Sequence, residues 1–198
     1  MKKEEDVIYF ITTNNFKFNE IRKLFEYEKI PYQLKQLNLE TIEIQTESIR
    51  ENASFKLNSV KSIANCSCFV EDAGFFVDKP LNGFPGVYSS YVFKTIGNEG
   101  ILRLINNFNQ SKAHFITIIA LFFKPFKKDF FFEGKVEGRI SERRRGSGGF
   151  GFDPIFIPNI VQNRTFAELT TEEKNKISHR GKAWNEMIQF LKEVKSSS

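Results

Sequence analysis

The sequence predicts an α/β protein whose mixed β-sheet is flanked by helices. Strand-like apolar runs alternate along the chain with apolar stripes at helical spacing. Two long β segments, residues 115–123 and 130–140, follow one another across the short stretch 124–129. This arrangement is typical of a β-hairpin, which places antiparallel neighbours in the sheet, so the sheet is not all parallel.

Strand and helix alternate in the first half of the chain. The expected strands cover residues 7–12, 32–37 and 68–71, with 74–78 as a candidate continuation of the third. A turn at residues 13–15 leads into the first helix, and Ser48 with Glu51 fits a capping box that opens the second. The inward stripes of these helices comprise Phe18, Ile21, Leu24, Phe25, Ala53, Leu57, Val60 and Ala64.

The second half begins with a loop over residues 82–86, and a helix is expected over residues 98–108. Thr170 and Glu173 fit another capping box ahead of a final helix. The inward residues of these helices comprise Ile101, Leu104, Ile105, Phe108, Trp184, Ile188 and Leu191. Residues 196–198 are expected to form a frayed tail, and His114 is expected at the surface.

The composition indicates one domain over residues 1–198, in one or two lobes, with a sizeable core. Hydrophobic residues make up 40% and charged residues 27%, as in soluble globular proteins. No apolar run is long enough for a membrane span, and the N-terminus lacks the apolar region of a signal peptide. Cys66 and Cys68 lack further metal-ligand partners, so we expect reduced packing residues in a cytoplasmic protein.

The net charge of +5 is compatible with a nucleic acid or a small polyanionic substrate. The one dense basic run comprises Arg143, Arg144 and Arg145, and elsewhere Lys and Glu alternate. This pattern does not predict a stripe for binding a nucleic-acid duplex.

The segment 149–154 and the later residues Lys174, His179 and Arg180 bring together two aromatic rings, a carboxylate, an imidazole and cations. Rings stack on nucleobases, and these polar groups can bond a base edge or phosphate. The segment therefore indicates a pocket for one nucleotide. In the alternative interpretation, Phe150 and Phe152 are core residues and the charges are solvated.

Two further groups suit phosphate chemistry. Asn14 and Lys17 lie where a strand turns into a helix N-terminus, which is a ready anion site, although the P-loop pattern is absent. Glu71 and Asp72 are expected at a strand end, where adjacent carboxylates suit Mg²⁺. Glu43, Glu47 and Lys56 are candidates to join them, whereas a solvated turn is the alternative.

Several motifs occur in an order that resembles the inosine triphosphate pyrophosphatase, or Ham1, family. They cover residues 11–20, 51–56, 70–78, 81–89, 149–156, 165–168, 173–175 and 178–180. The resemblance implies an elongated α/β protein with two lobes around a central substrate cleft, usually a homodimer. It implies Mg²⁺-dependent cleavage of deaminated purine nucleotides (ITP, dITP and XTP) to the monophosphate and pyrophosphate, which cleanses the nucleotide pool.

The resemblance also implies roles for individual residues. Phosphates would be held by Thr12, Thr13, Asn14, Asn15, Phe16 and Lys17, with Lys56 and Lys174 assisting. The metal would be held by Glu43, Glu71 and Asp72, and Asp72 would activate water as base or metal-organising carboxylate. The base would be positioned by Phe150, Gly151, Phe152 and Asp153, and its edge read by His179 and Arg180.

Five residues depart from the usual family pattern. Thr13 replaces a frequent glycine, Ala73, at the substrate site, replaces a frequent hydroxyl residue, and Phe152 replaces Tyr or Trp. Arg143 and Arg144 extend a position that typically carries one arginine, matched here by Arg145.

Charge supports metal dependence, because Glu71 and Asp72 would repel a triphosphate unless Mg²⁺ intervened. Two other interpretations remain open. One is a nucleotide pyrophosphatase for other modified bases, and the other is a non-catalytic nucleotide or nucleic-acid binding module. The acids disfavour the module, since a polyanion binder gains nothing from them. We therefore expect a nucleoside triphosphate as partner, with neither a stable nucleic acid nor a membrane.

Overall fold

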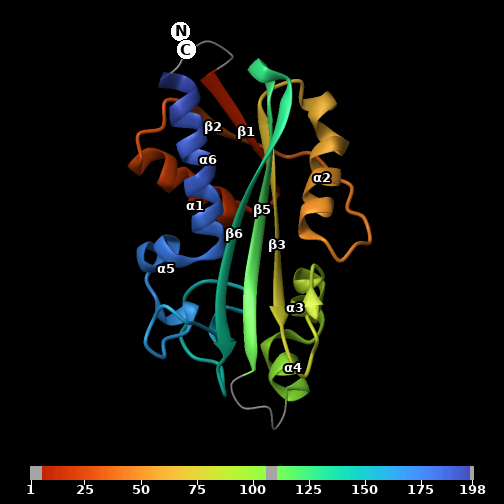
Figure 1. The fold of residues 1–198 in the computed structure, drawn as a ribbon, viewed down its shortest axis with the longest axis vertical. Coiled ribbons are helices and arrows are strands. Elements are labelled where there is room, and N and C mark those ends of the chain that lie inside the picture. The colour runs from red at the N-terminus through yellow and green to blue at the C-terminus, as the bar shows by residue number, and fades with distance from the viewer. Residues whose placement is uncertain (1–5, 106–110, 197–198) are drawn as a thin grey trace. The chain divides into compact units, whose positions relative to one another are not determined.

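The computed structural model describes residues 6–105 and 111–196 and confirms the mixed α/β fold (Figure 1). Within the described residues, seven strands form one sheet in the order β2-β1-β3-β5-β6-β7, and β4 pairs with β3. The strands are β1 (Val7–Ile11), β2 (Gln33–Leu37), β3 (Cys68–Val77), β4 (Pro85–Gly86), β5 (Lys112–Phe123), β6 (Lys128–Ile140) and β7 (Phe156–Pro158). Since β1 is parallel to β2 and β3 while β6 and β7 are antiparallel, the sheet is mixed as predicted.

Six α-helices and three short 3-10 turns are seen in the described residues. The α-helices are α1 (Asn15–Tyr27), α2 (Ile49–Ala64), α3 (Ser89–Thr95), α4 (Gly97–Leu104), α5 (Thr171–Ile177) and α6 (His179–Ser196). The 3-10 turns are η2 (Lys124–Phe126), η3 (Asp153–Ile155) and η4 (Phe166–Glu168). None of these helices is long and apolar enough to cross a membrane.

The chain divides into two compact units, each with its own core. The first unit comprises Met1–Asp72, Ile118–Glu133 and Ala183–Ser198, and the second comprises Ala73–Thr117 and Gly134–Lys182. In the first unit, α1 and α6 pack on one face of the sheet and α2 lies on the other (Figure 1). The stacked rings of Phe10 and Phe69, 4.5 Å apart, and the fully buried Trp184 belong to this first core.

Capping explains where the helices of the first unit begin. The Asn14 side chain caps α1, and the Ser48 hydroxyl accepts a hydrogen bond from the Glu51 N–H at the start of α2. In a full capping box the Glu51 carboxylate would accept from the Ser48 N–H, but here it accepts from the Thr46 hydroxyl at 2.6 Å. The helix ends at Asn65, whose left-handed backbone (φ 46°) is one that asparagine tolerates.

In the second unit the predicted capping box of Thr170 and Glu173 is present and opens α5. The helical segment that follows is broken at Ser178, whose backbone is extended, so α5 and α6 are separate helices. At Gly181 a Cβ would lie 1.8 Å from the Asn175 carbonyl oxygen, so only glycine allows the two helices to approach this closely.

The structure corrects several sequence predictions. Leu104 is 51% exposed and not inward, because α4 ends there, while Ile101 and Ile105 are buried as predicted. Phe108 lies outside the described residues. The expected loop over residues 82–86 contains the short strand β4, and α3 was not predicted. Ser196, assigned to a frayed tail, is the last residue of α6.

Candidate active site

The turn between β1 and α1 is held rigidly by its own side chains. The Asn14 Oδ1 accepts hydrogen bonds from the N–H groups of Phe16 (3.0 Å) and Lys17 (3.1 Å), and the Thr12 hydroxyl oxygen accepts from the Asn14 N–H (3.1 Å). Asn14 thus occupies two of the N–H groups that a phosphate could use. The helix dipole and the Lys17 ammonium group remain as attractions for an anion. Thr13, Asn15 and Phe16 are exposed at this turn.

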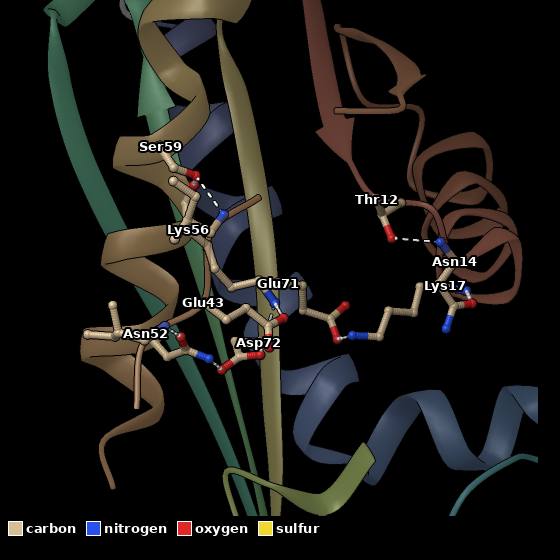
Figure 2. A network of polar contacts seen from close by, with 11 residues as sticks. Thr12, Asn14, Lys17, Glu43, Asn52, Lys56, Ser59, Glu71 and Asp72 are labelled. Carbon is tan, nitrogen blue, oxygen red and sulfur yellow. Dashed lines mark hydrogen bonds and ion pairs between the residues drawn. The ribbon is translucent and has the colours of Figure 1, made fainter. Parts of the chain in front are cut away.

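Glu71 and Asp72 lie within a strand and not at its end, which corrects the sequence prediction. Residues 74–77 belong to the same strand, so β3 continues past both acids to Val77. Successive side chains of a strand point to opposite faces, so the two carboxylates diverge. Glu71 contacts the Lys17 ammonium group of α1 at 3.2 Å, whereas Asp72 faces α2 (Figure 2).

The Asp72 carboxylate is fixed by two donors from α2. The Asn52 amide donates to its Oδ2 at 2.9 Å, and the Lys56 ammonium group lies 3.3 Å from its Oδ1. Lys56 also contacts the Glu43 Oε1 at 2.7 Å (Figure 2). Burial lowers the pKa of Lys56, but Asp72 and Glu43 together outweigh burial and raise its pKa, so the lysine stays charged.

The donors that could hold a metal are hard carboxylate oxygens, the type that Mg²⁺ prefers. Among the described residues, no three acids, histidines or cysteines lie close enough together to form a metal site. Instead, Glu43, Glu71 and Asp72 each face a lysine. Glu47 is exposed and is not part of this network. The residue types therefore fit a divalent cation, but binding it would require these ion pairs to open.

In the second unit, Asp153 organises the predicted base-binding loop. Its buried Oδ2 accepts hydrogen bonds from the Phe150 N–H at 2.8 Å and from the Lys174 ammonium group at 2.6 Å. Gly149 has a left-handed backbone (φ +67°), and a Cβ there would lie 2.1 Å from the same oxygen. Only glycine therefore allows the loop to close over Asp153. The Asn98 amide donates to the Gly151 carbonyl at 3.1 Å and tethers the other side of the loop.

The two rings of this loop have different surroundings. Phe150 is 38% exposed, and the Lys174 nitrogen and the Arg180 guanidinium carbon lie 5.0 Å and 4.9 Å from its ring centre. Phe152 is buried and stacks on Phe75, with ring centres 4.8 Å apart. The alternative interpretation, that this aromatic residue belongs to the core, describes Phe152 but not Phe150.

His179 and Arg180 are both buried at the start of α6. The His179 ring stacks on Phe115 at 4.6 Å with nearly parallel planes. Lys174, expected to assist with phosphate, lies in the second unit beside Asp153, whereas Lys17 and Lys56 lie in the first. The structure thus groups Phe150, Asp153, Lys174 and Arg180 together.

Sequence reasoning missed Asn52 and Asn98, the two amides that fix Asp72 and the loop. Both are buried. A signal was present, since Asn52 lies three residues after Ile49 and Asn98 three residues before Ile101, on otherwise apolar stripes. A polar residue at such a position needs a buried hydrogen-bond partner.

Known proteins resemble this chain over nearly its whole length. The Ham1 family model matches residues 8–190. The chain is 46% identical to a dITP/XTP pyrophosphatase of Thermococcus kodakarensis, over 93% of this chain and 96% of the relative. It is 42% identical to the dITP/XTP pyrophosphatase of Pyrococcus horikoshii, with the same coverages. The solved Ham1 protein of Staphylococcus aureus superposes with a TM-score of 0.81 at 28% identity, covering 95% of this chain and 99% of that one. The chain belongs to the Ham1 family.

Proposed function

We propose that this protein is a nucleoside triphosphate pyrophosphohydrolase that cleaves the deaminated purine nucleotides ITP, dITP and XTP to monophosphate and pyrophosphate. The proposal is supported by relatives that carry the name dITP/XTP pyrophosphatase. The observation that carries it is the interleaving of charge, in which Lys17 contacts Glu71 and Lys56 contacts Asp72. Lysines alone would suffice to bind phosphate, so the acids point to a divalent cation and catalysis.

In this proposal the phosphates bind at the turn of residues 12–17 and at Lys56. Glu43, Glu71 and Asp72 would hold Mg²⁺ once their ion pairs with the lysines open, and the bound ion would supply charge neutralisation and Lewis acidity. Asp72 accepts the proton of the attacking water or orients it, since Asn52 fixes the direction of the carboxylate. Cations placed around the leaving pyrophosphate stabilise the charge that develops as the bond breaks.

The base is recognised by residues of the second unit. The exposed part of the Phe150 ring provides a stacking surface, and Arg180, a donor-only group, bonds the 6-keto oxygen of hypoxanthine or xanthine. Because ATP carries an amino group at that position, its amino donor would face a guanidinium. We assign Lys174 to holding Asp153, which in turn fixes the loop, because the ammonium group is buried in that ion pair.

We further propose that the protein acts in the cytoplasm as a homodimer. Exposed large apolar side chains gather on and next to α3, where Tyr91 is 69% exposed and Tyr88 and Ile96 are also exposed. A second subunit that covered these side chains would remove their apolar area from water.

The experiment is to incubate the protein and Mg²⁺ with ITP, dITP, XTP, GTP and ATP and to identify the products. We expect ITP and XTP to be cleaved well ahead of ATP, with GTP poor, and monophosphate as the nucleotide product. If the protein prefers a nucleotide with another modified base, the proposed substrate class is wrong but the proposed reaction stands. Saturable nucleotide binding without any product would contradict the enzymatic proposal and favour a binding module.

A further inference from the structure

Two neighbouring cavities in the second unit are lined by the arginines that follow β6. The larger, about 560 Å³, is lined by Arg139, Arg143 and Arg145, with Glu142 as the only acid of its lining. The smaller, about 340 Å³, shares Arg143 and Glu142 with it and adds Arg103, Arg144 and Glu99. Guanidinium groups thus outnumber carboxylates in both cavities.

Asn163 fixes two of the guanidinium groups in the larger cavity. The Arg139 Nη2 donates to the Asn163 Oδ1 at 3.1 Å, and the Arg145 Nη2 donates to the Asn163 carbonyl oxygen. The buried Nε of Arg145 has no hydrogen-bond partner in the described part of the chain. Since these side chains are already ordered, less conformational entropy is lost when an anion binds them.

Arg143 adds a third, uncompensated charge. Neither Arg143 nor Arg144 makes a hydrogen bond or ion pair with any residue in the ranges 6–105 and 111–196, although Glu142 lines the same cavities. Arg145 forms an ion pair with Glu168 at 3.4 Å, so its charge is partly compensated. Like charges that line one cavity repel one another, and an anion bound among them would reduce that repulsion.

We propose that the larger cavity is an anion site for a small, multiply charged phosphate such as pyrophosphate or the phosphate end of a nucleotide. Guanidinium groups match phosphate oxygens in geometry and charge, and the volume is that of a small-molecule site. A concave site that includes Glu142 suits a small anion better than an extended nucleic-acid backbone, which needs a continuous basic surface. The site does not depend on the catalytic activity proposed above.

The test follows the arginine Nε–H signals of the ¹⁵N-labelled full chain during titration with sodium pyrophosphate, without divalent metal. The signals of Arg139, Arg143 and Arg145 should shift together and saturate. Binding at the lysines of the first unit does not contribute to these signals. Arg143→Gln should weaken binding about five- to tenfold, the effect of one partly solvated charge-assisted contact. The matched control is Arg22→Gln, which changes an exposed arginine of α1 and should leave the affinity unchanged.

A parallel titration with inosine monophosphate distinguishes the two phosphate sources. Tighter saturation by pyrophosphate supports an inorganic anion, and tighter saturation by the monophosphate supports a phosphate ester; either outcome supports the site. Shifts that grow linearly without saturation, or equal weakening by Arg22→Gln, would overturn it. So would saturation by a single-stranded oligonucleotide alone with steep salt dependence, which would indicate a nucleic-acid surface instead.

Discussion

Replacing Asp72 by asparagine changes the charge of the proposed catalytic carboxylate while nearly preserving its shape. In the structure this carboxylate accepts from the Asn52 amide at 2.9 Å and contacts the Lys56 ammonium group at 3.3 Å. Asparagine has one acceptor oxygen, so it can satisfy only one of these two donors. We therefore expect Asp72→Asn to nearly abolish turnover with a folded protein and largely intact substrate binding.

The two expected magnitudes differ enough to separate catalysis from folding. Losing one hydrogen bond to a charged group costs about 1.5–3 kcal/mol, and Lys56 keeps its 2.7 Å contact with Glu43, which reduces the loss. Such a change is small beside a typical unfolding free energy of about 5–15 kcal/mol. Removing a general base lowers kcat by about 10²–10⁴.

The assay compares kcat for ITP and the free energy of unfolding in urea between wild type and variant. The matched control is Asp129→Asn. Asp129 is another partly buried aspartate of the first unit, paired with the α2 residue Lys61 at 2.6 Å, and it lies outside the candidate site. The control should lose comparable stability and keep its kcat. Turnover of Asp72→Asn within a few-fold of wild type would remove Asp72 from the mechanism.

Three further predictions follow from named contacts. Arg180→Ala should reduce kcat/KM for ITP far more than for ATP, so that the ITP-to-ATP ratio of kcat/KM falls about ten- to a hundredfold. An unchanged ratio would exclude Arg180 as the residue that recognises the base. Gly149→Ala should lower the Tm and raise the KM for ITP, because the new Cβ would meet Asp153. The control is Gly151→Ala: Gly151 has a similar φ of +64°, but a Cβ there would have no neighbour within 4 Å, so this variant should cost only backbone strain. Burial, the largest influence, raises the pKa of the Cys68 thiol to about 12 from 9.0, so the free energy of unfolding should fall as pH rises from about 9 towards 12. Cys68→Ala should flatten that slope, and an identical slope in both proteins would contradict it.

Local sequence rules predicted the parts of the fold that local interactions determine. The caps at Ser48 and Thr170 and the burial of Trp184 depend on neighbouring residues or on helical spacing, and the structure has them. The hairpin of β5 and β6 follows from two apolar runs and a short turn, and these strands are neighbours in the sheet.

Other features of the site depend on partners that the sequence does not name. The divergence of Glu71 and Asp72 follows from the continuation of β3, which Gly74 made uncertain, since glycine weakens a strand signal. The pairing of Lys174 with Asp153 joins residues 21 positions apart. No spacing rule predicts which acid a buried lysine contacts.

The most direct test of the central claim is to follow ITP hydrolysis by ³¹P NMR with Mg²⁺ and then with excess EDTA. We predict that inosine monophosphate and pyrophosphate appear together in equal amounts, without orthophosphate, and that EDTA stops the reaction. This result follows if carboxylates beside Lys17 and Lys56 hold the metal and the lysines hold the leaving pyrophosphate. Orthophosphate as the first product, or full activity in EDTA, would contradict the account.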